Sequence, residues 1–152
     1  MKNYKLGVIG HGYVGESQSF AFSPSFDVRV YDKDSLKSTH SLNEVLDSDF
    51  VFVCVPTPMK KDGSQDLSFV ENFFKTAKEG PIYIIKSTVI PGTTNLLNEK
   101  FKNLKIIFSP EFLTERTAKL DILTQTRIIL GGDKNLTSKV RNIYNIRFKN
   151  KT

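Results

Sequence analysis

The sequence predicts an α/β fold in which helices cover both faces of one doubly wound parallel sheet. Two patterns carry this prediction: short apolar runs rich in β-branched residues recur along the chain, and segments of helical periodicity separate them. Size agrees, because 152 residues, of which 39% are hydrophobic, suit one domain with its own core. Since no repeat, low-complexity tract or linker divides the chain, residues 1–152 are expected to form a single domain.

About six strands are expected, and most are continuously apolar, as is typical of strands that are covered on both faces. The expected strands are Lys5–Ile9, Asp27–Tyr31, Phe50–Val55, Ile82–Lys86, Lys105–Phe108 and Arg127–Leu130. Right-handed crossovers between parallel strands place their carboxyl ends, and the loops that follow, along one edge of the sheet.

Helical periodicity is clearest where apolar residues recur at i, i+3, i+4 and i+7. These residues are Val70, Phe73, Phe74 and Ala77. Ser68 and Glu71 have the spacing of a capping box at the start of this helix. Another helix is expected over Thr94–Lys102, with Thr93 and Thr94 as candidate N-cap residues.

Composition and charge argue against several classes of protein. The net charge is +6, but the basic residues are scattered without a run of five, which argues against a nucleic-acid interface. The densest basic segment, Arg147–Lys151, is expected to be a solvated tail. No stretch approaches the ~18 apolar residues that span a bilayer, and the N-terminus lacks the apolar core of a signal peptide. The one cysteine, Cys54, is expected to be a packed thiol in a reducing cytoplasm, and no metal site is expected.

Gly10–Gly15 matches the pattern G-x-G-x-x-G directly after the first strand and at the start of a helix. In that context Gly10 permits a tight turn, Gly12 lets the backbone approach a pyrophosphate, and Gly15 lets helix and strand pack closely. Free N–H groups at the helix start then bind the phosphates. The motif predicts a Rossmann-type dinucleotide site, and the alternative is a turn without a ligand.

Asp32 closes the second strand, 22 positions after Gly10, where an acidic side chain accepts hydrogen bonds from the adenosine ribose. A carboxylate there repels a 2′-phosphate, so the cofactor is expected to be NAD rather than NADP, although Lys33 beside it weakens that argument. The alternative is that Asp32 caps the following turn together with Asp34.

Hydroxyl and carboxylate side chains follow three further strands. Thr57 lies between two prolines after the third strand, and Ser87 and Thr88 follow the fourth, where they could bind a nicotinamide or a substrate. Glu111 and Glu115 follow the fifth strand, four positions apart. These carboxylates could serve as a general base and a ligand contact, or could equally lie on a solvated helical turn paired with basic neighbours.

Taken together, these motifs resemble the N-terminal NAD-binding domain of the UDP-glucose/GDP-mannose (nucleotide-sugar) 6-dehydrogenase family. The shared signatures are GxGYVG at Gly10–Gly15, VPTP at Val55–Pro58, Asp62-Gly63 with Asp66, Ser87–Val89 followed by Pro91-Gly92-Thr93, SPEFL at Ser109–Leu113 with Glu115, and RIxxG at Arg127–Gly131. Each is weak alone, but in this order they cover nearly the whole chain and are specific.

The resemblance implies that a nucleotide sugar, most readily a UDP-hexose, is oxidised at its C6 alcohol to a carboxylate by two hydride transfers to NAD. The residues it assigns to the cofactor are Gly10, Gly12, Tyr13, Val14, Asp32, Thr57, Thr88 and Glu115, and Ser87 joins them by its position after the fourth strand. Glu111 is similar to the family's acid/base or water-positioning glutamate, and Thr88 to a threonine that orients water. The backbone of Glu111, Phe112 and Leu113 is expected to face the sugar.

The chain departs from the family pattern in three places. Only 17 residues separate Asp32 from Phe50, fewer than usual, and Arg116 stands where the family has a glycine. No residue matches the cysteine, lysine and asparagine that the family's central helical and C-terminal domains supply, and the 152 residues do not include those domains. The chain alone is therefore expected to bind NAD without turning over a UDP-sugar.

Three interpretations follow from these departures. The chain is the NAD-binding part of a nucleotide-sugar dehydrogenase, completed by the missing domains or by a second chain. Alternatively it is a free-standing NAD-binding or assembly module without catalytic activity, or another NAD-dependent alcohol dehydrogenase whose homo-oligomer partner supplies the substrate groups.

Overall fold

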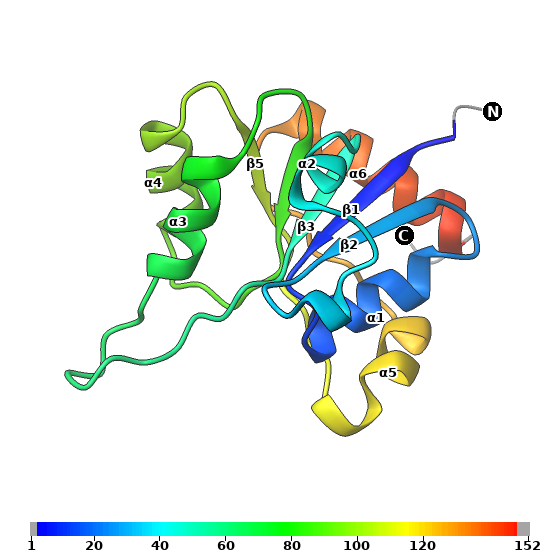
Figure 1. Ribbon diagram of the computed structural model, residues 1–152, viewed down its shortest axis with the longest axis horizontal. Helices are drawn as coiled ribbons and strands as arrows, with labels where there is room; N and C mark the ends of the chain where they lie inside the picture. The colour runs from blue at the N-terminus through cyan, green and yellow to red at the C-terminus, as the bar shows by residue number, and fades with distance from the viewer. Residues whose placement is uncertain (1–2, 149–152) are drawn as a thin grey trace.

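A computed structural model of the chain, which describes residues 3–148, contains one sheet of five parallel strands in the order β2-β1-β3-β4-β5. The strands are β1 (Lys5–Ile9), β2 (Asp27–Tyr31), β3 (Phe50–Val53), β4 (Ile82–Ile85) and β5 (Lys105–Phe108). Because every pair is parallel, the carboxyl ends share one edge of the sheet (Figure 1). The predicted Rossmann-type doubly wound sheet is confirmed. Strands β3 and β4 end earlier than expected, so Cys54, Val55 and Lys86 belong to the loops at this edge.

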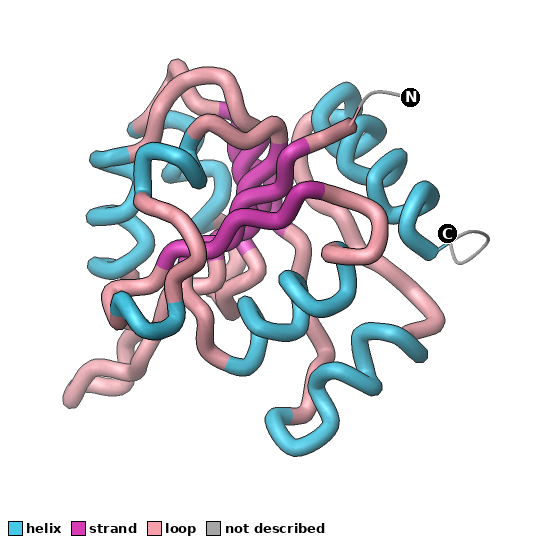
Figure 2. The backbone as a smooth tube through the Cα atoms, turned by 45° about the vertical axis from the view of Figure 1, so that its right-hand side comes forward, coloured by secondary structure: helices cyan, strands magenta, loops and turns pink. Residues whose placement is uncertain are grey.

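Helices flank the sheet on both sides, as Figure 2 shows. They are α1 (Tyr13–Phe22), α2 (Leu42–Leu46), α3 (Ser68–Thr76), α4 (Thr93–Lys100), α5 (Ala118–Thr124) and α6 (Lys134–Phe148), with short 3-10 turns at Ser35–Lys37 and Glu115–Thr117. Between β3 and α3 the chain projects from the body as a narrow arm, which an antiparallel bridge between Met59 and Gln65 closes (Figure 1).

Alternation along the strands divides the core into two layers. Phe50 and Phe52 of β3 pack with α1 and α6 on one face, whereas Val51 and Val53 pack with α3 and α4 on the other. Successive side chains of a strand point to opposite faces, so a continuously apolar strand supplies both layers. The aromatic ring of Phe22 lies at the centre of the first layer.

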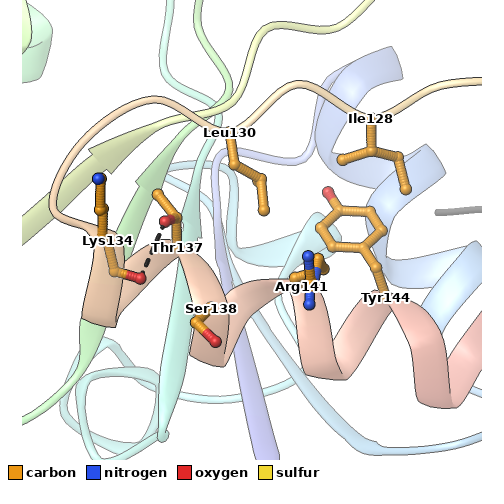
Figure 3. A pocket seen from close by; sticks show the side chains of 7 residues that line it. All are labelled: Ile128, Leu130, Lys134, Thr137, Ser138, Arg141 and Tyr144. Carbon is orange, nitrogen blue, oxygen red and sulfur yellow. Dashed lines mark hydrogen bonds between the residues drawn. The ribbon is translucent and has the colours of Figure 1, made fainter.

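The expected sixth strand, Arg127–Leu130, is not a strand in the structure. The segment touches the sheet only where Gly131 and Phe108 form an isolated antiparallel bridge, with N···O distances of 2.8 and 2.9 Å. Gly132, at φ 139°, then turns the chain away from β5. Ile128 and Leu130 instead border a cavity of about 440 Å³ opposite α6 (Figure 3).

Two expectations about helix starts are wrong. Ser68 is the first residue of α3 rather than its N-cap, which is Leu67, and the Asp66 carboxylate two residues earlier accepts the Ser68 N–H. Helix α4 begins at Thr93, its N-cap is Gly92 with a left-handed φ of 90°, and the Thr93 hydroxyl donates backwards to the Ile90 carbonyl. A short side chain that can bond to local backbone has several such options, and spacing alone does not choose among them.

The basic C-terminal segment also differs from expectation. Arg147 and Phe148 end α6: the Arg147 guanidinium donates to the Ala21 carbonyl, and the Phe148 ring packs edge-on against Phe22. The rest of the expected tail, residues 149–151, lies outside the described residues. No helix among residues 3–148 is long and apolar enough to cross a membrane.

A capping box does occur, at α2, which the sequence patterns did not predict. The Ser41 hydroxyl accepts the Glu44 N–H at 3.3 Å, and the Glu44 carboxylate accepts the Ser41 N–H at 2.8 Å. Ser41→Ala is therefore expected to lower the free energy of unfolding by about 1 kcal/mol in urea titrations. Ser138→Ala, at an exposed position within α6, is the control; an equal change in both variants would contradict the role of the cap.

Candidate functional site

The loop between β1 and α1 is closed by two glycines in very close packing. Gly10 adopts a left-handed φ of 85° and donates its N–H to the Tyr31 carbonyl at 2.9 Å. A Cβ on Gly10 would lie 2.6 Å from the Cys54 carbonyl oxygen, and one on Gly15 would lie 1.8 Å from the Gly10 oxygen. Both positions exclude any side chain, so these glycines hold the start of α1 directly against the ends of β1 and β3.

The start of α1 is arranged to receive an anion. Gly12 is the N-cap and no side chain caps the helix, so the first N–H groups, including those of Tyr13 and Val14, point out of the loop. A Cβ on Gly12 would meet nothing within 4 Å, so open space lies above these donors. The acidic residue of the first turn, Glu16, pairs with Lys119 at 2.7 Å, which lowers its pKa and offsets its charge. These features fit a pyrophosphate.

Asp32 lies at the carboxyl end of β2, against this loop. One carboxylate oxygen accepts the His11 N–H at 2.7 Å and the other accepts the Asp34 N–H at 2.8 Å. Partial burial opposes ionisation, but these hydrogen bonds and the nearby charge of Lys37 outweigh it and lower the pKa of Asp32. The carboxylate caps its own turn and faces the glycine loop at the same time, so the two interpretations from the sequence are compatible.

A crevice of about 390 Å³ opens beside Asp32, between the ends of β1 and β2 and one face of α3. Its lining includes Ile9, Gly10, Tyr31, Asp32, Lys33, Leu42, Val55, Pro56, Phe69 and Asn72. The walls are mostly apolar, with Asp32 at one side, as expected for a site that takes a flat heterocycle with an attached diol. Lys33 lies over the ring of Phe69, 5.3 Å from its centroid, so its charge borders the crevice. The sequence patterns did not identify Phe69 or Asn72, which lie on the helix face next to the apolar stripe.

The loops that follow β3 and β4 are joined by hydrogen bonds to the backbone of Thr88. The Thr57 hydroxyl and the Gln65 amide both donate to the Thr88 carbonyl at 2.7 Å, and Gln65 also accepts the Ile90 N–H at 3.0 Å. The structure thus brings Thr57 and Thr88 together, whereas their contact with a cofactor stays a prediction. Gln65, which the motifs did not single out, ties the base of the projecting arm to the loop after β4.

Ser87 and Thr88 differ in what their side chains do. Ser87 is buried, and its hydroxyl donates to the Val55 carbonyl at 2.6 Å, which holds the ends of β3 and β4 together. The side chain of Thr88 is exposed at the edge of the sheet. A contact of either residue with a cofactor stays a prediction, and in this structure the proton of Ser87 serves the backbone.

The loop after β5 places both predicted glutamates near the start of α1. Glu111 and Glu115 each lie close enough to Tyr13 that, after partial burial, their charges help raise the pKa of its hydroxyl. The Glu111 carboxylate accepts the Leu113 N–H at 2.5 Å, and Leu113 packs against the core. Phe112 is 60% exposed beside this turn. The start of the first helix and the loop after the last strand therefore meet at one edge of the sheet.

Cys54 lies under the glycine loop. Burial raises the pKa of its thiol to about 12, so at neutral pH the sulfur is a thiol and not a nucleophilic thiolate. The expectation of a packed, unreactive cysteine agrees with this environment.

Comparisons with known proteins match this arrangement. Residues 27–147 match the UDP-glucose/GDP-mannose dehydrogenase family, NAD binding domain. The chain is 31% identical to a UDP-glucose 6-dehydrogenase of Streptococcus pneumoniae, over 85% of this chain and 41% of that protein. A UDP-glucose dehydrogenase structure from Pyrobaculum islandicum superposes with a TM-score of 0.82 at 26% identity, over 96% of this chain and 45% of that one. A GDP-mannose dehydrogenase structure from Pseudomonas aeruginosa gives 0.75 at 25% identity, over 92% and 44%. The chain thus spans less than half the length of these relatives.

Proposed function

Because the chain belongs to the UDP-glucose/GDP-mannose dehydrogenase family as an NAD binding domain, we propose that it supplies the NAD-binding half of a nucleotide-sugar 6-dehydrogenase. In this proposal the complete enzyme oxidises the C6 alcohol of a UDP-hexose to a carboxylate. The observation that carries it is the meeting of the uncapped start of α1 with Glu111 and Glu115 at the carboxyl edge of the sheet. Ligands of parallel α/β sheets bind at this edge.

The cofactor roles follow from the position of each residue. Gly10, Gly12, Tyr13 and Val14 receive the pyrophosphate, because their backbone is close-packed below and open above. The ionised carboxylate of Asp32 accepts hydrogen bonds from the ribose hydroxyl groups. The remaining contacts on the cofactor side are assigned to Thr57, Ser87 and Glu115.

The catalytic roles fall on the loop after β5 and the loop after β4. When bound, NAD accepts hydride from the substrate carbon. Oxidation of an alcohol also requires a group that takes the hydroxyl proton, and Glu111 is assigned this acid/base role or the positioning of the water needed for the second oxidation. The exposed Thr88 orients that water, and the backbone of Phe112 and Leu113 faces the sugar.

Covalent chemistry is assigned to residues outside this chain's site. Cys54 is unsuited to it, because its thiol stays protonated at neutral pH. Further domains of the same polypeptide or a second chain would supply the nucleophile. The 152 residues alone are expected to bind NAD without oxidising a UDP-hexose.

Calorimetric titration with NAD and with NADP tests the cofactor assignment. We expect saturable NAD binding that is at least about tenfold tighter than NADP binding, because the Asp32 carboxylate repels a 2′-phosphate. Asp32→Ala should weaken NAD binding by about tenfold, equivalent to ~1.4 kcal/mol, and remove the preference.

Asp27→Ala is the matched control, since Asp27 is an exposed carboxylate at the opposite end of the same strand. It should leave both affinities unchanged. If neither NAD nor NADP binds at millimolar concentration, the proposed function is overturned and only the fold remains.

A further inference from the structure

Lys86 is a buried lysine that none of the proposed roles uses. It is the first residue after β4, is 5% exposed, and forms no ion pair within the described part of the chain. Its ammonium group donates to the Ser109 hydroxyl at 3.2 Å and to the Pro110 carbonyl at 3.4 Å. Both acceptors are uncharged, so the hydrogen bonds of the ammonium group go to dipoles.

The acceptors of Lys86 belong to a polar network inside the core. Ser109 is fully buried, donates its N–H to the Ile85 carbonyl at 3.0 Å, and its hydroxyl lies close enough to Tyr144 to influence the pKa of that phenol. Tyr144 comes from α6, where it appears beside the cavity of Figure 3. The network therefore joins the end of β4, the end of β5 and α6 at one point.

The network ends at the loop that carries Glu111. Pro110, whose carbonyl Lys86 holds, is the residue directly before Glu111, and the charges of Lys86 and Glu111 attract one another. The Glu111 carboxylate in turn closes the turn to Leu113. A buried ammonium group without a paired carboxylate lowers the stability of the fold. A structural role for Lys86 in this loop would account for its presence despite that cost.

We propose that Lys86 is a positioning residue: its ammonium group, bound to Ser109 and Pro110, holds the loop Ser109–Leu113 so that Glu111 faces the cofactor edge. The inference rests on the proposed role of Glu111, and it assigns Lys86 no contact with substrate or cofactor. Loss of the ammonium should release this loop while the sheet remains intact.

The charge of Lys86 can be switched by pH. Burial lowers its pKa from 10.5 to about 8, against the opposing effects of Cys54 and Glu111. The other titratable groups packed around it are Cys54, from the loop after β3, and Tyr144, from α6, and burial raises the pKa of both well above 8. The ammonium is present below about pH 8 and is lost above it.

As pH rises, the stability of the domain and the order of the loop Ser109–Leu113 should change in opposite directions. Since the folded protein holds this proton less tightly than the unfolded chain does, the stability of the whole domain should rise between about pH 8 and 10.5. The loop should loosen over the same interval. A lysine that merely supported the fold would not separate these two responses.

Amide hydrogen exchange on the full chain, resolved by residue, tests the proposal. In Lys86→Met, exchange at residues 111–114 should rise at least about tenfold at pH 7 while the β1 amides stay protected. In the wild type the same loop amides should gain an extra acceleration near pH 8, beyond the uniform effect of hydroxide, and Lys86→Met should lack it. Lys86→Arg should restore most of the protection.

Lys105→Met is the matched control, because Lys105 is an exposed lysine at the start of the neighbouring strand and donates to the Gly80 carbonyl. It should leave the loop unchanged. Loop exchange in Lys86→Met that equals wild type, or that rises equally across all strands, would overturn the proposal. NAD titration of the same samples distinguishes the role of Lys86 from the proposed function. NAD binding with unchanged loop exchange in Lys86→Met refutes only the role of Lys86. Faster loop exchange in Lys86→Met, in a protein that does not bind NAD, refutes only the proposed function.

Discussion

Gly12→Ala is expected to leave the domain folded and yet weaken NAD binding by on the order of a hundredfold. Gly12 has φ −75° and ψ −168°, which alanine adopts without strain, and its Cβ would meet no protein atom within 4 Å. The added methyl group would instead occupy the space above the first N–H groups of α1, where the backbone and a pyrophosphate must approach closely.

Two other glycines provide the comparison for this prediction. Gly15→Ala places a Cβ 1.8 Å from the Gly10 oxygen, so it should unfold the domain or shift α1 and lower its melting temperature strongly. Gly131→Ala makes only an ordinary contact of 3.8 Å and should change neither property. Thermal unfolding and NAD titration of all three variants test this; full NAD affinity in Gly12→Ala would show that the ligand does not bind over α1.

The strands and the cofactor loop could be predicted because their signals are local. Continuous apolar runs such as Phe50–Val53 have few alternatives to a buried strand, and a glycine pattern between strand and helix specifies its own geometry. The meeting of Tyr13 with Glu111 and Glu115 could also be expected, since parallel strands bring their carboxyl ends to one edge.

Features that depend on tertiary contacts could not be predicted in this way. Arg127–Leu130 has the composition of a strand, but the segment pairs with β5 only at the single antiparallel bridge between Gly131 and Phe108. Whether a serine caps a helix depends on which neighbouring groups bind its backbone, and here the Asp66 carboxylate accepts the Ser68 N–H. The burial of Lys86 does have a sequence signal, because this charged residue directly follows an apolar run whose neighbours are expected to be buried.

Phe22→Ala is expected to lower the free energy of unfolding by about 3–5 kcal/mol, a large share of the ~5–15 kcal/mol typical of a domain. The Phe22 ring is fully buried and packs against Phe52 of β3 at 5.2 Å and against Tyr144 and Phe148 of α6 at 5.1 and 5.7 Å between ring centroids. Its removal leaves a cavity where α1, the sheet and α6 meet. Urea unfolding measures the loss.

Phe20→Ala is the matched control, because Phe20 lies on the same helix, is 44% exposed, and contacts only the Lys119 cation among aromatic and charged partners in the described residues. Its cost should stay below about 1 kcal/mol. Since NAD is proposed to bind only the folded domain, NAD at a hundred times its Kd should raise the free energy of unfolding of Phe22→Ala by about 2.7 kcal/mol. If both substitutions cost the same, α1 is not anchored through Phe22. If NAD restores no stability to a variant that still folds, the folded domain does not bind NAD, because a ligand that binds only the folded state stabilises it whichever part of the fold it contacts.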